Sequence, residues 1–299
     1  MTMTTTPREL PHQPWGRVRE CRRTADRLMK IIATGFTFTA IFVLFWILGM
    51  LVVKGIGGLS VATFTAVTPG PGTEGGGIAN AIVGTIIMTA IATAIAVPVG
   101  VLTAIFTSQL APKRVSDFIR LMLNVLAGVP TIVIGIFIFG VLVVGHGQSA
   151  IAASLGLSIV MVPLIARATE EVLLLVPSTL REGGMALGAT RARTVITVIL
   201  PTAVGGIVTA TIVAVARGAG ETAPLLFTSS IFANSVVTDV HQAMASIPLT
   251  IFVDSESPSV ADQQTAWAAA LVLMAGVLIM GIIGRALSLR TRRQIERAR

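Results

Sequence analysis

The chain contains little cysteine and little charge. Cys21 is the single cysteine among 299 residues, so an internal disulfide and a cysteine-based metal cluster are both excluded. His12, His146 and His241 are far apart and lack the spacing of metal ligands, so we expect no bound metal. Charged residues make up only 12% of the chain and hydrophobic residues 54%. A soluble core of this length would need more polar covering, and the composition therefore indicates a membrane protein.

Motifs for nucleotide hydrolysis and for catalysis are also missing. Lys30, Lys54 and Lys113 are the only lysines, and none follows a glycine-rich turn of the kind that binds phosphates. The chain has neither a G-x-S-x-G elbow nor an H-E-x-x-H pair. The glycine-rich run TEGGG, residues 73–77, has no strand before it and is interpreted as a flexible loop. We therefore expect a protein that is not an enzyme, with no catalytic residues and no cofactor.

Long apolar runs are abundant, and several approach or exceed the roughly 20 residues that a helix needs to cross a bilayer. The first run is too long for the apolar region of a signal peptide, so we expect it to be retained. Prolines lie inside three runs, at Pro98, Pro130 and Pro163, which is tolerated where neighbouring helices satisfy the freed carbonyls and which implies kinks in a packed bundle. The sequence predicts an all-α membrane protein with about six spans. The expected spans are 31–53, 78–107, 118–144, 149–166, 198–216 and 266–287.

Basic residues gather on one side of this layout. All of the 22 lysines and arginines except Lys54 and Arg217 fall in the two terminal segments and in the loops after the second and fourth spans. By the positive-inside rule both termini are cytoplasmic. Glu170 and Glu171, at the inner end of the fourth span, are expected to form a solvated pair. The net charge of +8 is then explained by contact with membrane lipid, not with nucleic acid. The layout has a basic tail at 1–30, a membrane domain at 31–287 and a second basic tail at 288–299, with acidic residues in the opposite loops at Glu74, Asp239, Asp254, Glu256 and Asp262.

The cytoplasmic loop between the fourth and fifth spans, residues 177–201, reads PSTLREGGMALGATRARTVITVILP. We expect Ser178 to cap a first helix, with the acidic Glu182 near its first turns. Gly188 offers a break, and Thr190 can cap a second short helix that continues into the fifth span. The loop would then present a compact knob to the cytoplasm. An amphipathic helix lying in the membrane interface is the alternative that spacing alone leaves open.

The same loop resembles the EAA motif of ABC importer permeases. The matching residues are Glu182, Gly183, Gly184, Gly188, Ala189, Leu200 and Pro201. Gly183 and Gly184 occupy the positions of the two alanines, a change that costs about 1 kcal/mol in the middle of a helix. In such permeases this loop is the coupling helix, which docks in a cleft of a separate ATPase subunit. The resemblance implies that Glu182 is a charged anchor and that ATP is bound by the partner.

A second segment, RGAGETAPLLF at 217–227, places two opposite charges directly after an apolar run. Arg217 and Glu221 are four residues apart and would share one face of a helix. The intervening glycines and Pro224 favour a broken or re-entrant backbone, and broken helices line transport paths. Because a charge within the bilayer costs about 2.5–3.5 kcal/mol, we expect Arg217 to face a translocation path, with Glu221 as its counter-ion. A structural ion pair between the fifth span and a neighbour is the alternative.

Three runs together resemble PstA-type permease subunits of phosphate ABC importers: RGAGETAPLL at 217–226, NVLAGVPTIVIGIF at 124–137 and SIPLTIF at 246–252. The resemblance implies a type I ABC importer permease (MetI-like) fold in the bacterial cytoplasmic membrane. It implies inorganic phosphate as substrate, with Thr222 and Asn124 as further residues of the path, although Asn124 could instead bridge two helices. The implied partners are a PstC-like permease, a PstB-like ATPase dimer and a PstS-like phosphate-binding protein.

Three other functions are weighed against this one. A permease of the same kind for molybdate or sulfate is opposed by the GETAPL segment, residues 220–225. An ion-coupled secondary carrier would work without an ATPase and would leave the loop at 177–201 without a purpose. A membrane-embedded enzyme would need a clustered catalytic set near the interface, and the sequence shows none.

Overall fold

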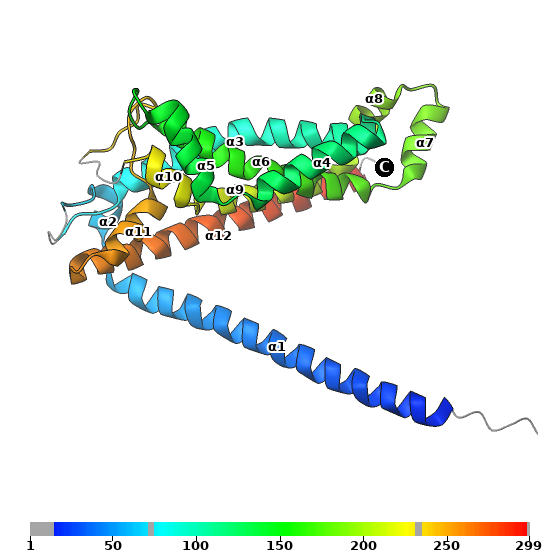
Figure 1. Cartoon of the computed structure of the whole chain (residues 1–299), viewed down its shortest axis with the longest axis horizontal. Coiled ribbons are helices and arrows are strands. Elements are labelled where there is room, and N and C mark those ends of the chain that lie inside the picture. The colour runs from blue at the N-terminus through cyan, green and yellow to red at the C-terminus, as the bar shows by residue number, and fades with distance from the viewer. Residues whose placement is uncertain (1–14, 71–74, 231–234, 298–299) are drawn as a thin grey trace, which may run out of the picture. The chain divides into compact units, whose positions relative to one another are not determined.

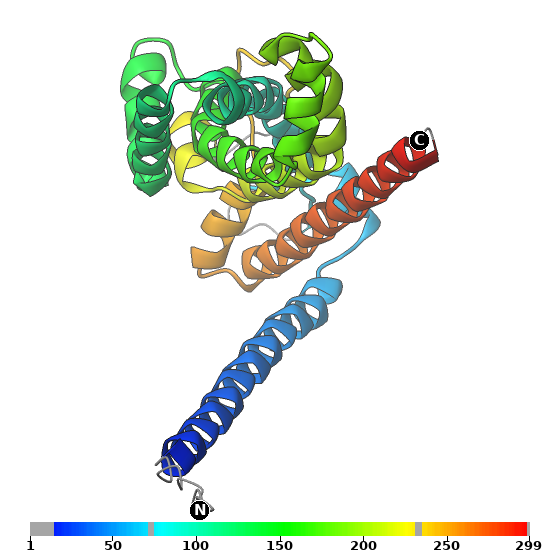
Figure 2. The ribbon, with the colours of Figure 1, turned by 90° about the vertical axis from the view of Figure 1, so that its right-hand side faces the viewer.

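The computed structural model describes the backbone of residues 15–70, 75–230 and 235–297, and side chains over 26–70, 75–230 and 235–286. Every secondary-structure element in this part of the chain is a helix (Figure 1, Figure 2). The chain divides into two units, residues 1–52 and 53–299. Glu74 and the cationic side chains of both predicted tails, apart from Lys30 and Arg27, lie outside the described side chains.

The first unit consists of most of helix α1, Trp15–Gly57. Its apolar part, Asp26–Gly57, is long enough to cross a membrane and contains the predicted first span. The helix begins well before that span, so the segment predicted as a basic tail is helical from Trp15 onward. Lys30 bonds Asp26 at 2.8 Å, one helical turn away. Exposed pairs of this kind add only about 0.3–0.5 kcal/mol to a helix.

The second unit is a helical bundle built around α6. Among the described residues, and with α1 included, five helices are long and apolar enough to span a membrane, or six if one bent pair is counted. This agrees with the predicted number. The long helices of the second unit are α3 (Ala79–Ile105), α6 (Ala150–Leu174), α9 (Leu200–Ala219) and α12 (Val260–Arg297). Pro163 lies inside α6 without ending it, and α12 extends far into the predicted C-terminal tail.

Small residues allow α3 and α6 to approach closely. Ala92, Ala96 and Ala153 are fully buried between the helices of one apolar core. A Cβ atom added to Gly100 of α3 would lie 2.8 Å from Cγ2 of Ile165 in α6. Membrane helices associate through such close contacts, because lipid offers no hydrophobic driving force between them. The central position of α6 in the bundle follows from this packing.

The predicted third span, 118–144, is bent sharply at Pro130, where a kink is expected. The chain forms α4 (Lys113–Gly128) and α5 (Thr131–Ile138), which are bent by 91° at the break between them. Pro130 has no N–H for the helical ladder and restricts Val129 to an extended conformation. Val129 indeed has φ −68° and ψ 129°. Helix α4 therefore ends here. A π-helical turn, η2 (Phe139–Val143), continues α5.

Three short helices complete the unit at the end opposite α7 and α8 (Figure 1). They are α2 (Val61–Thr65), α10 (Ala223–Thr228) and α11 (Ile247–Glu256). The backbone N–H of Ile247 donates to Oγ1 of Thr85 in α3 at 2.8 Å, which fixes the start of α11. Beside α11 is a pocket of about 320 Å³ lined in part by Asp254, Glu256 and Asp262. Burial, and to a smaller extent the charge of Asp262, raises the pKa of Asp254 to about 6.

We expect Asp254→Asn to remove part of the pH dependence of stability. The pKa of Asp254 is higher in the folded protein than in the unfolded chain, where it is about 3.9. The folded state therefore binds the proton more tightly, and this contribution to stability is lost as pH rises from about 4 through 6. Thermal unfolding in detergent at pH 4.5 and pH 7.5 measures it: the asparagine variant should lose less stability between the two values. An identical loss in both proteins would contradict the assignment.

Candidate coupling segment and translocation path

Residues 177–201 form a helical hairpin at one end of the second unit (Figure 1). Helix α7 (Ser178–Ala186) is followed by a turn in which Gly188 has φ +81°. Oγ1 of Thr190 then accepts from the N–H of Arg193 at 3.3 Å and caps α8, Arg191–Thr194. The predicted helix, glycine turn and capped second helix are confirmed. The prediction that Ser178 caps α7 is wrong, because Pro177 takes the cap position and Ser178 is already helical.

The two glycines at the alanine positions of the motif have different surroundings. A Cβ at Gly184 would lie 2.6 Å from Cγ2 of Thr194, which is fully buried, whereas a Cβ at Gly183 would meet nothing within 4 Å. Gly184 is therefore a point of close contact between α7 and α8. Glycine is therefore needed in place of alanine at position 184 and not at position 183.

We expect Gly183→Ala and Gly184→Ala to have opposite effects on α7. Alanine at 183 should stabilise α7 by about 1 kcal/mol through its higher helix propensity, at no steric cost. Alanine at 184 must displace Thr194, and overpacking of this kind costs about 1–3 kcal/mol. Hydrogen exchange of the amides in residues 178–186 is the measurement, with protection rising in the first variant and falling in the second. Equal changes in the two variants would contradict the tight contact at Gly184.

The tip of the hairpin combines a carboxylate with an apolar side chain. Glu182 is exposed on α7, and Leu187, in the turn, is 90% exposed. Sequence reasoning identified Glu182 and missed Leu187, although an apolar residue directly before the turn glycine was a visible signal. The hairpin tip therefore exposes one carboxylate and one large apolar side chain.

The hairpin is continuous with the fifth span. Helix α8, the π-helical turn η3 (Val195–Ile199) and α9 form one helix from Arg191 to Ala219. Pro201 has no N–H for the carbonyl of Thr197, and the π-helical turn directly before it accommodates this missing bond. Leu200 and Ala189 are half-buried and Pro201 is exposed. The motif residues outside the tip therefore shape the junction with the span.

Arg217 lies in the last turn of α9, and Glu221 follows in the break after it. Their side chains are 4.0 Å apart, from Nε to Oε1, with Arg217 66% exposed and Glu221 17% exposed. A Cβ at Gly218 would lie 2.6 Å from Sδ of Met161, so α9 is held against α6 at this level. The chain leaves the helix at Gly220, and the predicted break is confirmed.

The break is held between α5 and α6 by the short helix α10. A Cβ at Gly135 of α5 would lie 3.0 Å from the carbonyl oxygen of Ala223 and from Cα of Pro224. Thr222 is half-buried beside Glu221. Asn124 is exposed on α4, and its side chain makes no hydrogen bond within the part of the chain that the structure describes. The structure therefore brings Arg217, Glu221 and Thr222 together and places no described partner beside Asn124.

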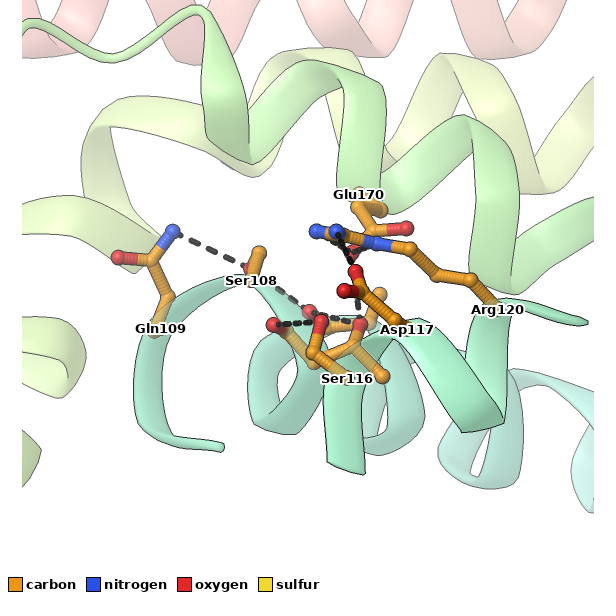
Figure 3. Close-up of polar contacts among 8 residues, drawn as sticks. Ser108, Gln109, Ser116, Asp117, Arg120 and Glu170 are labelled. Carbon is orange, nitrogen blue, oxygen red and sulfur yellow. Dashed lines mark hydrogen bonds and ion pairs between the residues drawn. The ribbon is translucent and has the colours of Figure 1, made fainter. Parts of the chain in front are cut away.

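A partly buried polar joint links α4, α6 and the π-helical turn η1, Phe106–Leu110, that ends α3 (Figure 3). Arg120 donates from Nε and Nη2 to Oε1 of Glu170 at 3.0 and 2.9 Å, and Oγ1 of Thr107 donates to the same oxygen at 2.8 Å. Glu170 is 8% exposed, so the predicted solvated pair of Glu170 and Glu171 is wrong. Arg120 is 39% exposed, so the ion pair is only partly shielded from water.

Comparisons with known proteins identify the family of the chain. The profile of the family described as binding-protein-dependent transport system inner membrane component matches residues 96–293. The "Phosphate transport system permease protein PstA" of Yersinia pestis is 38% identical over 267 residues, covering 88% of this chain and 90% of that protein. The "Probable phosphate transport system permease protein PstA" of Methanocaldococcus jannaschii is 37% identical over 254 residues, covering 85% of this chain and 90% of that protein.

Solved structures support the fold. A bacterial ABC transporter that imports the acidic polysaccharide alginate has a chain with a TM-score of 0.63 at 12% identity, covering 92% of this chain and 99% of that one. A chain of the inward-facing MetNI methionine ABC transporter has a TM-score of 0.56 at 21% identity, covering 71% of this chain and 93% of that one. The protein is a multi-pass membrane protein with the MetI-like permease fold. It belongs to the family of binding-protein-dependent transport system inner membrane components, as a PstA-type permease.

Proposed function

We propose that this chain is the transmembrane permease subunit of an ATP-driven phosphate importer and forms half of its translocation path. The observation that carries the proposal is the single helix from Arg191 to Ala219, which joins the exposed hairpin to the Arg217–Glu221 pair. At 1.5 Å per residue this helix is roughly 40 Å long. It can therefore transmit movement from a docking surface at one end to a charged group at the other.

The chemistry of the pair favours an anion as the transported species. Arg is the side chain best shaped to bind a phosphate, through its planar fork of donors. Glu221 would hold Arg217 in position and keep the empty path from binding an anion too tightly. Arg217 has no ion-pair partner on another helix among the described residues. This disfavours the alternative of a structural ion pair between the fifth span and a neighbour. Thr222 and Asn124 complete the proposed path.

The names of the relatives favour phosphate over molybdate or sulfate. A secondary carrier would have no use for an exposed hairpin that is rigidly joined to a span. ATP would be bound and hydrolysed by a partner ATPase, and this chain would hold no nucleotide or other cofactor of its own. The proposed partners are a PstC-like permease, a PstB-like ATPase dimer and a PstS-like phosphate-binding protein.

The hairpin at 177–201 and both termini are proposed to lie in the cytoplasm. The support is the distribution of arginine and lysine, which leaves only Lys54 and Arg217 away from that side. Asp254 and its pocket would then lie on the opposite side, where the binding protein delivers its ligand.

The test is uptake of radiolabelled phosphate at low external concentration by cells that lack their own high-affinity system. The chain is co-expressed with the full set of partner subunits, and molybdate and sulfate uptake are measured in parallel. ATP-dependent uptake of phosphate alone is the expected result. Uptake of another oxyanion in its place would refute the substrate, and phosphate uptake without the ATPase would refute the mechanism.

A further inference from the structure

The joint of Arg120, Glu170 and Thr107 lies next to the hairpin. Glu170 is one helical turn before Leu174, the last residue of α6, and α7 begins shortly afterwards at Ser178. The turn η1, which carries Thr107, contacts α8. Leu173, three residues after Glu170 on α6, packs in one apolar cluster with Val195 and Ile199 of η3. Any displacement of the hairpin therefore reaches Glu170 and Thr107 through direct contacts.

Helix α4 depends on this joint for its position. Only Ser116 and Leu123 are buried among its 16 residues, so little apolar packing holds it to the bundle. Its polar contacts are the two bonds from Arg120 to Glu170 and the bond from Oγ of Ser116 to the carbonyl oxygen of Thr107 at 2.8 Å. All three bonds end on Glu170 or Thr107, which belong to the joint (Figure 3). When α6 and η1 move, these bonds decide whether α4 moves with them.

The other end of α4 leads toward the proposed path. Helix α4 runs from the hairpin end of the unit toward α5, and the chain turns by 91° between them (Figure 1). Helix α5 packs closely against α10 at Gly135 and Pro224, and α10 begins two residues after Glu221. A chain of contacts thus runs from the hairpin through the joint, α4 and α5 to α10. Helix α10 lies next to the break that carries Arg217 and Glu221.

We propose that Arg120, Glu170 and Thr107 are positioning residues that make α4 follow the hairpin. Movement of the hairpin then reaches the contact between α5 and α10 as well as α9. The inference rests on the proposed function of the chain. The hairpin then acts on the path along two routes, directly through the helix that ends at Ala219 and laterally through the joint. Loss of the joint leaves the first route intact and removes the second.

Charge reversal in the complete transporter tests this inference. Arg120→Glu, Glu170→Arg and the double exchange are reconstituted with all partner subunits in proteoliposomes, with Asp117→Asn as the control on the same helix. Asp117 accepts from Nη1 of Arg120 at 3.5 Å within α4, so it touches the arginine of the joint but does not link α4 to another helix. The assembled amount, ATP hydrolysis and phosphate transport are measured. Each single reversal should lower phosphate transported per ATP at least tenfold while hydrolysis continues, the double exchange should restore most of it, and Asp117→Asn should match the parent.

Two results would overturn the inference. If single reversals reduce only the assembled amount, with phosphate per ATP unchanged, the joint is a folding contact. If the double exchange rescues nothing while it assembles normally, the pairing is not the relevant property.

A second measurement needs no substrate. In a Cys21→Ser background, Val125→Cys on α4 is labelled with a thiol reagent with and without ATP. ATP should change the labelling rate in the parent and not in Arg120→Glu. A parent that shows no change would refute the movement of α4. A parent that changes but carries no phosphate would instead point to failure of the proposed substrate.

Discussion

Arg217→Ala is expected to reduce phosphate uptake roughly tenfold to a hundredfold while leaving association with the ATPase intact. A charge-assisted hydrogen bond contributes about 1.5–3 kcal/mol, and each 1.4 kcal/mol corresponds to about a factor of ten. The alanine variant removes the donors of that bond at the far end of the helix, well away from the hairpin. The initial rate of radiolabelled phosphate uptake and co-purification of the ATPase measure the two effects separately.

Arg167→Ala is the matched control, because Arg167 is an exposed arginine on α6, outside both the hairpin and the proposed path. It should retain phosphate uptake far better than Arg217→Ala. Arg217→Lys should recover only part of the rate, because an ammonium group is a point charge without the planar fork. Unchanged uptake in Arg217→Ala would exclude Arg217 from the path. Joint loss of uptake and ATPase binding would show that the residue is structural.

Local signals in the sequence were sufficient to predict most of the fold. The length of the apolar runs determined the number of spans, and Gly188 and Thr190 located the turn and cap of the hairpin, because each acts on its own backbone. The same kind of reasoning failed at Ser178, and at Pro130 it predicted a kink but not the size of the bend. Pro163 is tolerated inside α6, whereas Pro130 separates two helices bent by 91°. A proline signal alone does not distinguish these outcomes, since they depend on the packing of neighbouring helices.

Contacts between distant segments could not be predicted from one sequence. Arg120 and Glu170 are 50 residues apart, and no local pattern indicates that they meet. Gly183 and Gly184 are adjacent and look equivalent, yet only Gly184 faces Thr194. The Arg217–Glu221 pair was predictable because its spacing is that of one helical turn. Its exposure, and the position of α10 beside it, are results of tertiary packing.

Leu187→Asp is expected to weaken binding of the ATPase at least tenfold, and more than Glu182→Gln does. Leu187 is 90% exposed in the free chain, and burying a leucine side chain contributes about 1.5–3 kcal/mol. An exposed ion pair at Glu182 would contribute only about 0.2–1 kcal/mol. The affinity of the purified partner ATPase for the variants, measured at low and high salt, separates the two contributions.

Salt should weaken the effect of Glu182→Gln, because ions screen exposed charges, and should leave the effect of Leu187→Asp unchanged. Leu187→Met, which conserves volume, should bind nearly as well as the parent. Leu175→Asp is the control for a leucine outside the hairpin, since Leu175 is 82% exposed just beyond the end of α6. If Glu182→Gln weakens binding more than Leu187→Asp at high salt, the docking surface is a charged contact in which the carboxylate is buried. If neither variant changes the affinity, the ATPase contacts another part of the chain, and the helix from Arg191 to Ala219 does not carry its movement to Arg217.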